Sequence, residues 1–352
     1  MSNIFKSNLV IKMEGASHTP LMRITVDGFP KGVYVDCEVI NHDLAKRRPS
    51  ANLSNARKEN DNYRFLEGIS NGYTNGGKLV IEIDNTNFNS DNYQKGIIRP
   101  SHVDYPAYVK YGETYDYRGG GQFSGRLMAL IVILGALCKG ELVNKGVKIA
   151  SHIKKIGEVS DDKANYSDEE IEKLNNDLTI NDQALKKMQS LIKEAKENKD
   201  SLGGIIEAYA KGVKVGLGED YFGGLDAKIS SLMFSIPGVK EVLFGNEDAL
   251  NGYGSNYNDQ LAYQDDKVVF LSNNAGGING GLANGMPVIV NVGFRPTASI
   301  GKCQKSINII SKENIDLCIS GNHDACFAYR CGVIVEGMLA IALLDTYLGE
   351  AK

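Results

Sequence analysis

The sequence LMALIVILGALC, residues 127–138, is the longest apolar run in the chain. Its twelve residues are too few for a membrane span, which requires about 20. As a helix it would make more than three turns without a polar face, and such a helix has to be buried on all sides. The run therefore predicts a core helix that other elements cover.

A second apolar run lies near the C-terminus, at residues 332–348, and an arginine stands just before each run. These are Arg126 for the first run and Arg330 for the second. Neither helix can be left facing water, so we expect the two to pack against each other. That packing would bring Arg126 and Arg330 close together, where both could point at one ligand.

Two glycine-rich stretches repeat one pattern. They are GISNGYTNGGKLVI at 68–81 and GINGGLANGMPVIV at 277–290, and both lead into an apolar strand. Further matches occur in the same order along the chain and pair 26–33 with 206–213, 43–46 with 225–228, and 99–101 with 295–297. Ordered matches of this kind predict an internal duplication, with repeats at about 24–137 and 204–347.

The expected architecture is α+β, with the two units packed through their helices into a layered sandwich. No Pro/Ser-rich linker divides the sequence, so we treat 1–352 as a single domain. A polar stretch at about 158–180 is predicted to be a solvated insertion, and Asp182 is a candidate cap for the amphipathic helix that follows it.

The overall composition is that of an ordinary globular protein with a slight negative charge. Lys and Arg number 39 against 43 Asp and Glu, which gives a net charge of −4. This balance argues against a dedicated nucleic-acid binder, which needs a basic face. No secretion signal or membrane span is visible, so a cytoplasmic location and no membrane partner are expected.

The cysteines show no pattern typical of a metal site or a disulfide framework. No C-x-x-C pair occurs among the six, which are Cys37, Cys138, Cys303, Cys318, Cys326 and Cys331. Their expected state is the reduced thiol, and no metal site is predicted.

Two histidines and a set of arginines stand in turns where ligands are commonly bound. His18 lies in GASHTP and His102 in RPSHVDY. The arginines at turns or helix starts are Arg47, Arg48, Arg57, Arg99, Arg118, Arg126, Arg295 and Arg330. Arginine makes bidentate contacts to carboxylates and phosphates. In an acidic protein, this placement predicts a pocket for a small molecule with several negative charges.

Two loops offer backbone N–H groups to such a ligand. RGGGQFSGR at 118–126 joins three glycines to a helix start, and NNAGGINGG at 273–281 is a second glycine-rich loop. The first favours an anion or the edge of a flavin-like ring. Neither is a dinucleotide or P-loop motif, and no hydrolase or metalloprotease signature is present.

Taken together, these motifs resemble the chorismate synthase family over nearly the whole chain. The matching strings are GASHTP (15–20), DLAKRRP (43–49), RPSHVDYPAYVKYG (99–112), YDYRGGGQFSGR (115–126), DSLGG (200–204), GVKVGLGEDYFGGLDA (212–227), SIPGVK (235–240), NNAGGINGG (273–281), RPTASI (295–300) and GNHDACFAYR (321–330). The resemblance implies a β-α-β sandwich, with core helices between antiparallel sheets, in a homotetramer. It also implies the conversion of 5-enolpyruvylshikimate 3-phosphate to chorismate and phosphate with reduced FMN and no net redox change.

The resemblance assigns roles residue by residue. His18 matches the histidine near the leaving phosphate, and His102 the histidine that stabilises the reduced flavin by proton donation. Asp324 matches the aspartate beside flavin N5, and Ser17 and Ser124 match its proton relay. The positions that match substrate-binding arginines are Arg48, Arg99, Arg126 and Arg330.

Cofactor positions are implied in the same way. Arg47 matches a position that the family uses for a nicotinamide nucleotide. The flavin contacts would fall on Gln122, Phe123, Ser124, Pro237, Gly238, Gly280, Arg295, Pro296, Thr297, Ala298, Ser299 and Asn322. Because no nucleotide fingerprint is visible, NADPH would act only through a separate flavin reductase.

The chain departs from the family pattern near the flavin and phosphate positions. The departures are Ala16, Thr19, Gln122, Phe123, Leu127 and Asn322. They leave alternatives open: a divergent paralogue acting on another phosphorylated anionic metabolite, a non-catalytic metabolite-binding oligomer, or a flavin oxidoreductase. Retention of both histidines and Asp324 favours the lyase, since a pure binder would need only the arginines.

Overall fold

Two long helices cross in the middle layer of the protein. The computed structural model describes residues 3–48, 53, 61–86, 93–161, 163–247, 251–320 and 324–350. Within it, α3 (Met128–Asn144) packs against α8 (Gly332–Glu350), as the sequence predicted. A side chain on Gly135 would place its Cβ 2.4 Å from the Cα of Gly337, so the close crossing requires glycine.

Both helices are long and apolar enough to cross a membrane by length and composition alone. The most apolar windows of Gly125–Asn144 and Gly332–Glu350 are nevertheless 72% and 78% buried inside the protein. This is the environment of core helices, because sheets cover them from both sides.

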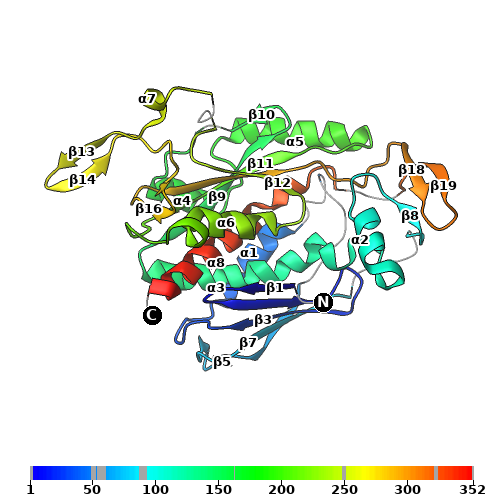
Figure 1. Cartoon of the computed structure of the whole chain (residues 1–352), viewed down its shortest axis with the longest axis horizontal. Helices are drawn as coiled ribbons and strands as arrows, with labels where there is room; N and C mark the ends of the chain where they lie inside the picture. The colour runs from blue at the N-terminus through cyan, green and yellow to red at the C-terminus, as the bar shows by residue number, and fades with distance from the viewer. Residues whose placement is uncertain are drawn as a thin grey trace.

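The first outer layer is a five-stranded antiparallel sheet from the N-terminal half (Figure 1). Its spatial order is β1-β2-β3-β7-β4. The strands are β1 (Asn3–Lys6), β2 (Val10–Glu14), β3 (Leu21–Asp27), β7 (Leu79–Asp84) and β4 (Tyr63–Glu67). Helix α1 (Cys37–Arg47) packs beside α3 and α8 in the middle layer.

The second outer layer is an antiparallel sheet from the C-terminal half, in the order β10-β9-β11-β17-β12. Its strands are β10 (Val159–Ser160), β9 (Lys148–Ile156), β11 (Gly204–Lys211), β17 (Val288–Phe294) and β12 (Val239–Phe244). Helix α6 (Leu225–Phe234) packs on α8 beneath it. The sheets and helices together confirm the predicted α+β sandwich (Figure 1).

The two sheets share strand order and direction from β2 to β4 and from β9 to β12. The glycine-rich turns also agree: φ is +90° and +80° at Gly68 and Gly72, and +80° and +87° at Gly277 and Gly281. Each turn holds a two-stranded hairpin, β5–β6 (Ile69–Ser70, Tyr73–Thr74) or β15–β16 (Ile278–Asn279, Leu282–Ala283). These features support the predicted duplication, which stays a prediction until the two segments are superposed.

The remaining elements lie around this sandwich. The helices are α2 (Asp104–Tyr111), α4 (Asp168–Leu174), α5 (Asp182–Glu197) and α7 (Gly254–Tyr257), with short 3-10 turns η1 (Gly112–Thr114), η2 (Gly121–Phe123), η3 (Gly125–Leu127), η4 (Tyr221–Gly223) and η6 (Phe327–Arg330). The strands are β8 (Ile97–Ile98), β13 (Leu261–Gln264), β14 (Lys267–Phe270), β18 (Gln304–Asn308) and β19 (Glu313–Leu317).

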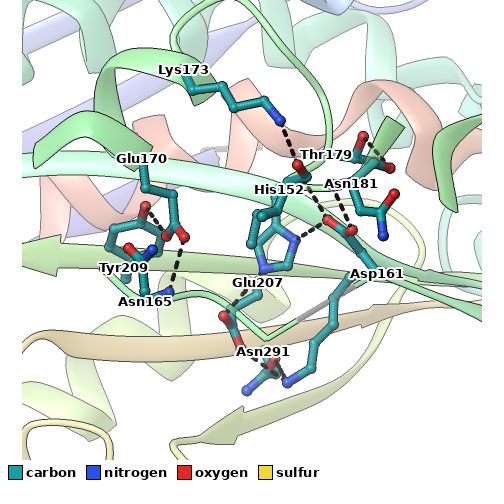
Figure 2. A network of polar contacts seen from close by, with 12 residues as sticks. His152, Asp161, Asn165, Glu170, Lys173, Thr179, Asn181, Glu207, Tyr209 and Asn291 are labelled. Atoms are coloured by element: carbon teal, nitrogen blue, oxygen red, sulfur yellow. Dashed lines mark hydrogen bonds and ion pairs between the residues drawn. The ribbon is translucent and has the colours of Figure 1, made fainter. Parts of the chain in front are cut away.

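The polar insertion is not the solvated excursion that its composition predicted. Ala164, Ile171 and Leu174 are buried and form a small second core against the outer face of the C-terminal sheet. A polar network at the same face ties β9 and β11 to the insertion through His152, Asp161 and Glu207 (Figure 2). Two carboxylates of this segment, Asp161 and Glu170, therefore serve as internal hydrogen-bond acceptors.

Two smaller predictions were wrong. Asn181, and not Asp182, caps α5, because its side chain accepts from the backbone N–H of Gln183. Cys303 and Cys318 are joined by a disulfide and are not reduced thiols. Cys303 precedes β18 and Cys318 follows β19. The pairing of these two strands brings the cysteines together at the open end of the hairpin, with 4.2 Å between their Cα atoms.

Candidate active site

Three arginines converge on one buried carboxylate, that of Asp61. Arg47 Nη2 lies 3.1 and 3.3 Å from the two carboxylate oxygens, and Arg126 Nη1 lies 2.5 Å from Oδ1. Arg48 Nε is 3.7 Å from Oδ2. Arg47 and Arg48 come from the end of α1 and Arg126 from η3, so these three arginines meet in space. Arg99 and Arg118, which the sequence also singled out, pair with Asp104 and Asp116 instead.

Asn85 connects this cluster to the loop that carries His18. Its side-chain amide donates to the carbonyls of Ser17 and Thr19 at 2.9 and 2.7 Å, and its oxygen accepts from Arg126 Nε at 3.2 Å. His18 is buried, and its ring lies edge-on to Tyr93 with centroids 5.3 Å apart. His18 and Arg126 are thereby fixed relative to each other through one amide.

His102 belongs to a second carboxylate-centred group. Its Nδ1 lies 2.7 Å from Asp104 Oδ1, while Arg99 donates to Asp104 from Nε and Nη2, both at 2.7 Å. Burial opposes ionisation of Asp104, but the hydrogen bonds from Arg99 and His102 outweigh it and lower the pKa of this carboxyl. An ionised Asp104 accepts a hydrogen bond from the Nδ1–H of His102, which leaves Nε2 of His102 as the basic nitrogen.

The charges around His102 favour its neutral form. Burial lowers the pKa of His102, and the hydrogen bond to Asp104 only partly offsets this; the positive charges of Arg99 and Arg295 lower the pKa further. The charge of Arg295, the first residue of the predicted flavin loop, is thus close enough to His102 to act on its pKa. An anion bound beside the ring would raise the pKa again.

Arg330 and Asp324 form the C-terminal part of the site. Arg330 donates to Asp324 Oδ2 from Nε at 3.0 Å and from Nη2 at 2.5 Å, and its guanidinium stacks 5.0 Å from the centroid of Phe327. The other oxygen, Asp324 Oδ1, is buried and has no hydrogen-bond partner within the described ranges. A buried acceptor of this kind is available to a ligand N–H.

The predicted flavin loop at 295–299 is anchored at its start and at its middle. The Arg295 N–H donates to the Gly238 carbonyl at 3.0 Å, next to Pro237, and Ser201 Oγ donates to the Thr297 carbonyl at 2.8 Å. The Thr297 hydroxyl is buried without a partner among residues that the structure describes. Thr297 Oγ1 and Asp324 Oδ1 are thus two buried polar atoms that could each form a hydrogen bond with a ligand.

The remaining residues predicted to bind flavin lie in several different parts of the fold. Ser124 Oγ accepts from the Arg126 N–H at 3.2 Å, while Gln122 and Phe123 form η2, where Phe123 is 38% exposed. Gly280 lies in the β15–β16 turn, at the opposite end of the fold from α2 (Figure 1). Pro296 is exposed, Ala298 and Ser299 are half-buried, and Asn322 lies outside the described residues.

Sequence reasoning missed the groups that hold the arginines and His102 in place. These are Asp61, Asn85, Asp104, Tyr93 and Tyr115, whose hydroxyl donates to Asp104 Oδ1 at 2.9 Å. Asp104 could have been found from its spacing, because it follows His102 by two residues at a helix start. Asp61 gave no such signal, since only folding brings it to Arg126, 65 residues away.

Comparison with known proteins identifies the relatives of this chain. The family model described as chorismate synthase matches residues 9–348. A chorismate synthase from Methanobrevibacter smithii is 37% identical over 352 residues, covering 98% of this chain and 96% of the relative. One from Thermococcus kodakarensis is 35% identical over 343 residues, covering 97% and 96%. A solved structure titled "Crystal Structure of Chorismate Synthase" has a TM-score of 0.77 at 26% identity, covering 97% of this chain and 92% of that one.

Proposed function

The chain belongs to the chorismate synthase family, and we propose that the site described above carries out the reaction of that family with reduced FMN bound. The protein is a carbon–oxygen lyase of the shikimate pathway that acts on a phosphate ester. Its substrate, 5-enolpyruvylshikimate 3-phosphate, loses phosphate and a ring proton by 1,4-anti elimination and gives chorismate.

The observation that carries this function is the grouping of arginines and histidines around three carboxylates. Asp61 gathers Arg47, Arg48 and Arg126; Asp104 gathers Arg99 and His102; Asp324 holds Arg330. A substrate with one phosphate and two carboxylates needs several guanidinium groups in fixed positions. A site that only bound an anion would not need the buried His18 and the partly buried His102 beside them.

His18 and His102 are the groups that hold and move protons. His18 is the proposed donor to the leaving phosphate, because a nearby dianion raises the pKa of an imidazole and favours its protonated form. His102 is oriented by Asp104 through Nδ1, so Nε2 faces away from the carboxylate. It gains a proton when negative charge develops beside it and can then stabilise an anionic ring.

The residues at the C-terminal side fit reduced FMN. When bound, reduced FMN supplies the electron density that lets the carbon–oxygen bond break without net oxidation. Asp324 Oδ1 would face its N–H groups, and the Thr297 hydroxyl would bind a polar group in the loop at 295–299. The proposed flavin contacts also include Gln122, Phe123, Ser124, Pro237 and Gly238. Gly280 lies in a different part of the fold, the β15–β16 turn, and is not included.

The remaining features of the proposed function rest on family membership. We infer a homotetramer in the cytoplasm and a separate flavin reductase that uses NADPH. The resemblance also implies a nicotinamide nucleotide contact at Arg47. Burial of Arg47, which is 1% exposed and hydrogen-bonded to Asp61, favours a role for this residue inside the anion cluster instead.

The function is tested by phosphate release from 5-enolpyruvylshikimate 3-phosphate with chemically reduced FMN under anaerobic conditions. The wild type should release phosphate catalytically, and His18→Ala should lower turnover by about 10²–10⁴, the range for lost acid–base catalysis. His42→Ala is the matched control, because His42 is half-exposed on α1 and its loss should leave turnover unchanged. Binding of the substrate without phosphate release would instead identify a metabolite-binding paralogue.

A further inference from the structure

Asp61 occupies an unusual position, because it is a buried carboxylate shared by three arginines from two separate segments. The side chain of Asp61 is 0% exposed, and those of Arg47 and Arg126 are 1% and 4% exposed. Arg48 is 43% exposed and extends toward solvent from the same cluster. The carboxylate therefore lies beneath the arginines, on the side away from solvent.

The physical effect of this placement is to set the spacing of the guanidinium groups. Neighbouring guanidinium groups repel each other, and burying one without a counter-charge is costly. Asp61 removes both penalties only while Arg47 and Arg126 stay within hydrogen-bond distance of it. Arg126 has a second anchor in Asn85, which also holds the His18 loop.

We propose that Asp61 is a positioning residue for substrate binding, which fixes Arg48 and Arg126 in the geometry that the phosphate and carboxylates of the substrate require. This inference rests on the proposed function and adds to it a residue that does not itself touch the substrate. Its carboxylate cannot be a favourable contact for an anion, so any effect on affinity has to act through the arginines.

The sign of the effect separates positioning from simple electrostatics. Asp61→Asn keeps the size of the side chain but removes one negative charge from the cluster. If Asp61 only reduced the positive charge of the pocket, the variant would bind an anion more tightly. If Asp61 sets the geometry, the variant binds the anion more weakly, despite the added net positive charge.

The matched control is Glu82→Gln. Glu82 is also a buried carboxylate paired with two arginines, Arg23 and Arg64, but it lies on the outer face of the N-terminal sheet. It reproduces the chemistry of losing an arginine partner at a place away from the site. A general loss of folding stability would appear in both variants.

The experiment measures binding of 5-enolpyruvylshikimate 3-phosphate by calorimetry, separately from turnover. We expect Asp61→Asn to weaken binding about 10–100-fold, Asp61→Glu to recover part of the loss, and Glu82→Gln to match the wild type. The same titrations with inorganic phosphate test the cluster even for a protein that binds but does not turn over, which is how failure of the proposed function would be recognised.

Unchanged or tighter binding by Asp61→Asn would overturn the inference. Should Asp61→Asn fail to fold, Asn85→Leu provides the second variant, because it removes the oxygen that accepts from Arg126 Nε without changing the charge of the cluster. It too should weaken binding of the substrate, and unchanged affinity there would also contradict positioning through Arg126.

Discussion

His152 is buried and His102 is partly buried, and both are bonded to aspartate, yet their surroundings shift their pKa values in opposite directions. His102 faces one carboxylate and the charges of Arg99 and Arg295, and its pKa is lowered, with burial as the main cause. For His152, burial also lowers the pKa, but hydrogen bonds to Asp161 and Glu207 outweigh it and the pKa is raised. Because burial lowers both pKa values, the opposite signs of the two shifts come from the charged groups around each ring.

This difference separates a functional histidine from a structural one. A neutral His102 can gain a proton when an anion arrives, so its charge can change during a reaction. His152 lies between Asp161 and Glu207, with Lys154 also bonded to Glu207, and its proton is held by both carboxylates (Figure 2). The predictions below test this contrast.

The largest expected effect is on catalysis. His102→Ala should lower turnover by about 10²–10⁴, because it removes a group that gains and donates a proton. His152→Gln should keep turnover within about threefold of the wild type in the folded protein. Phosphate release at saturating substrate measures both, and equal losses in the two variants would remove the distinction.

The next effect is on the free energy of unfolding, where His152→Gln should lose more than His102→Ala. His152→Gln leaves Asp161 and Glu207 without their shared cation, and breaking a buried ion pair in this way costs about 3–5 kcal/mol. His102→Ala should cost about 1 kcal/mol, since Arg99 still neutralises Asp104. Urea unfolding measures both values, and a smaller loss for His152→Gln than for His102→Ala would contradict the structural role.

The pH dependence of stability should also have opposite signs. The raised pKa of His152 gives stability that is fully present below its unfolded pKa of about 6.5 and is lost as pH rises through the folded pKa. The lowered pKa of His102 gives stability that is present above about pH 6.5 and lost as pH falls. Histidine NMR titration should find His102 below 6.5 and His152 above it. Of these two histidines, only His102 should show a higher pKa when substrate is bound.

Exposed charges on the opposite sheet should have the smallest effect. Arg23 and Glu82 are cross-strand neighbours in β3 and β7, as Glu207 and Asn291 are in β11 and β17. Arg23 and Arg64 are nearly half exposed, whereas the insertion buries the corresponding face of the C-terminal sheet. Arg64→Ala should therefore leave the urea unfolding curve close to that of the wild type, because exposed ion pairs contribute little to stability. A loss as large as that of His152→Gln would show that burial is not what separates the two faces.

The sequence predicted the elements whose chemistry is local. The apolar runs identified α3 and α8, the glycine-rich repeats identified the two matching turns, and the histidines and arginines of the site stood in recognisable motifs. The partners of these groups could not be predicted, because Asp61 meets Arg126 and Asp161 meets His152 only through the tertiary fold. The insertion was misjudged for the same reason: its charged residues looked solvated until the sheet beneath them was known.

The central claim is that the protein eliminates phosphate without consuming the flavin, and product stoichiometry tests it most directly. Wild-type protein should be mixed anaerobically with excess 5-enolpyruvylshikimate 3-phosphate and a small amount of reduced FMN. We expect one phosphate and one chorismate for each substrate consumed, far more product than flavin, and a flavin spectrum that is still reduced at the end. One oxidised flavin for each product, or no phosphate at all, would contradict the claim.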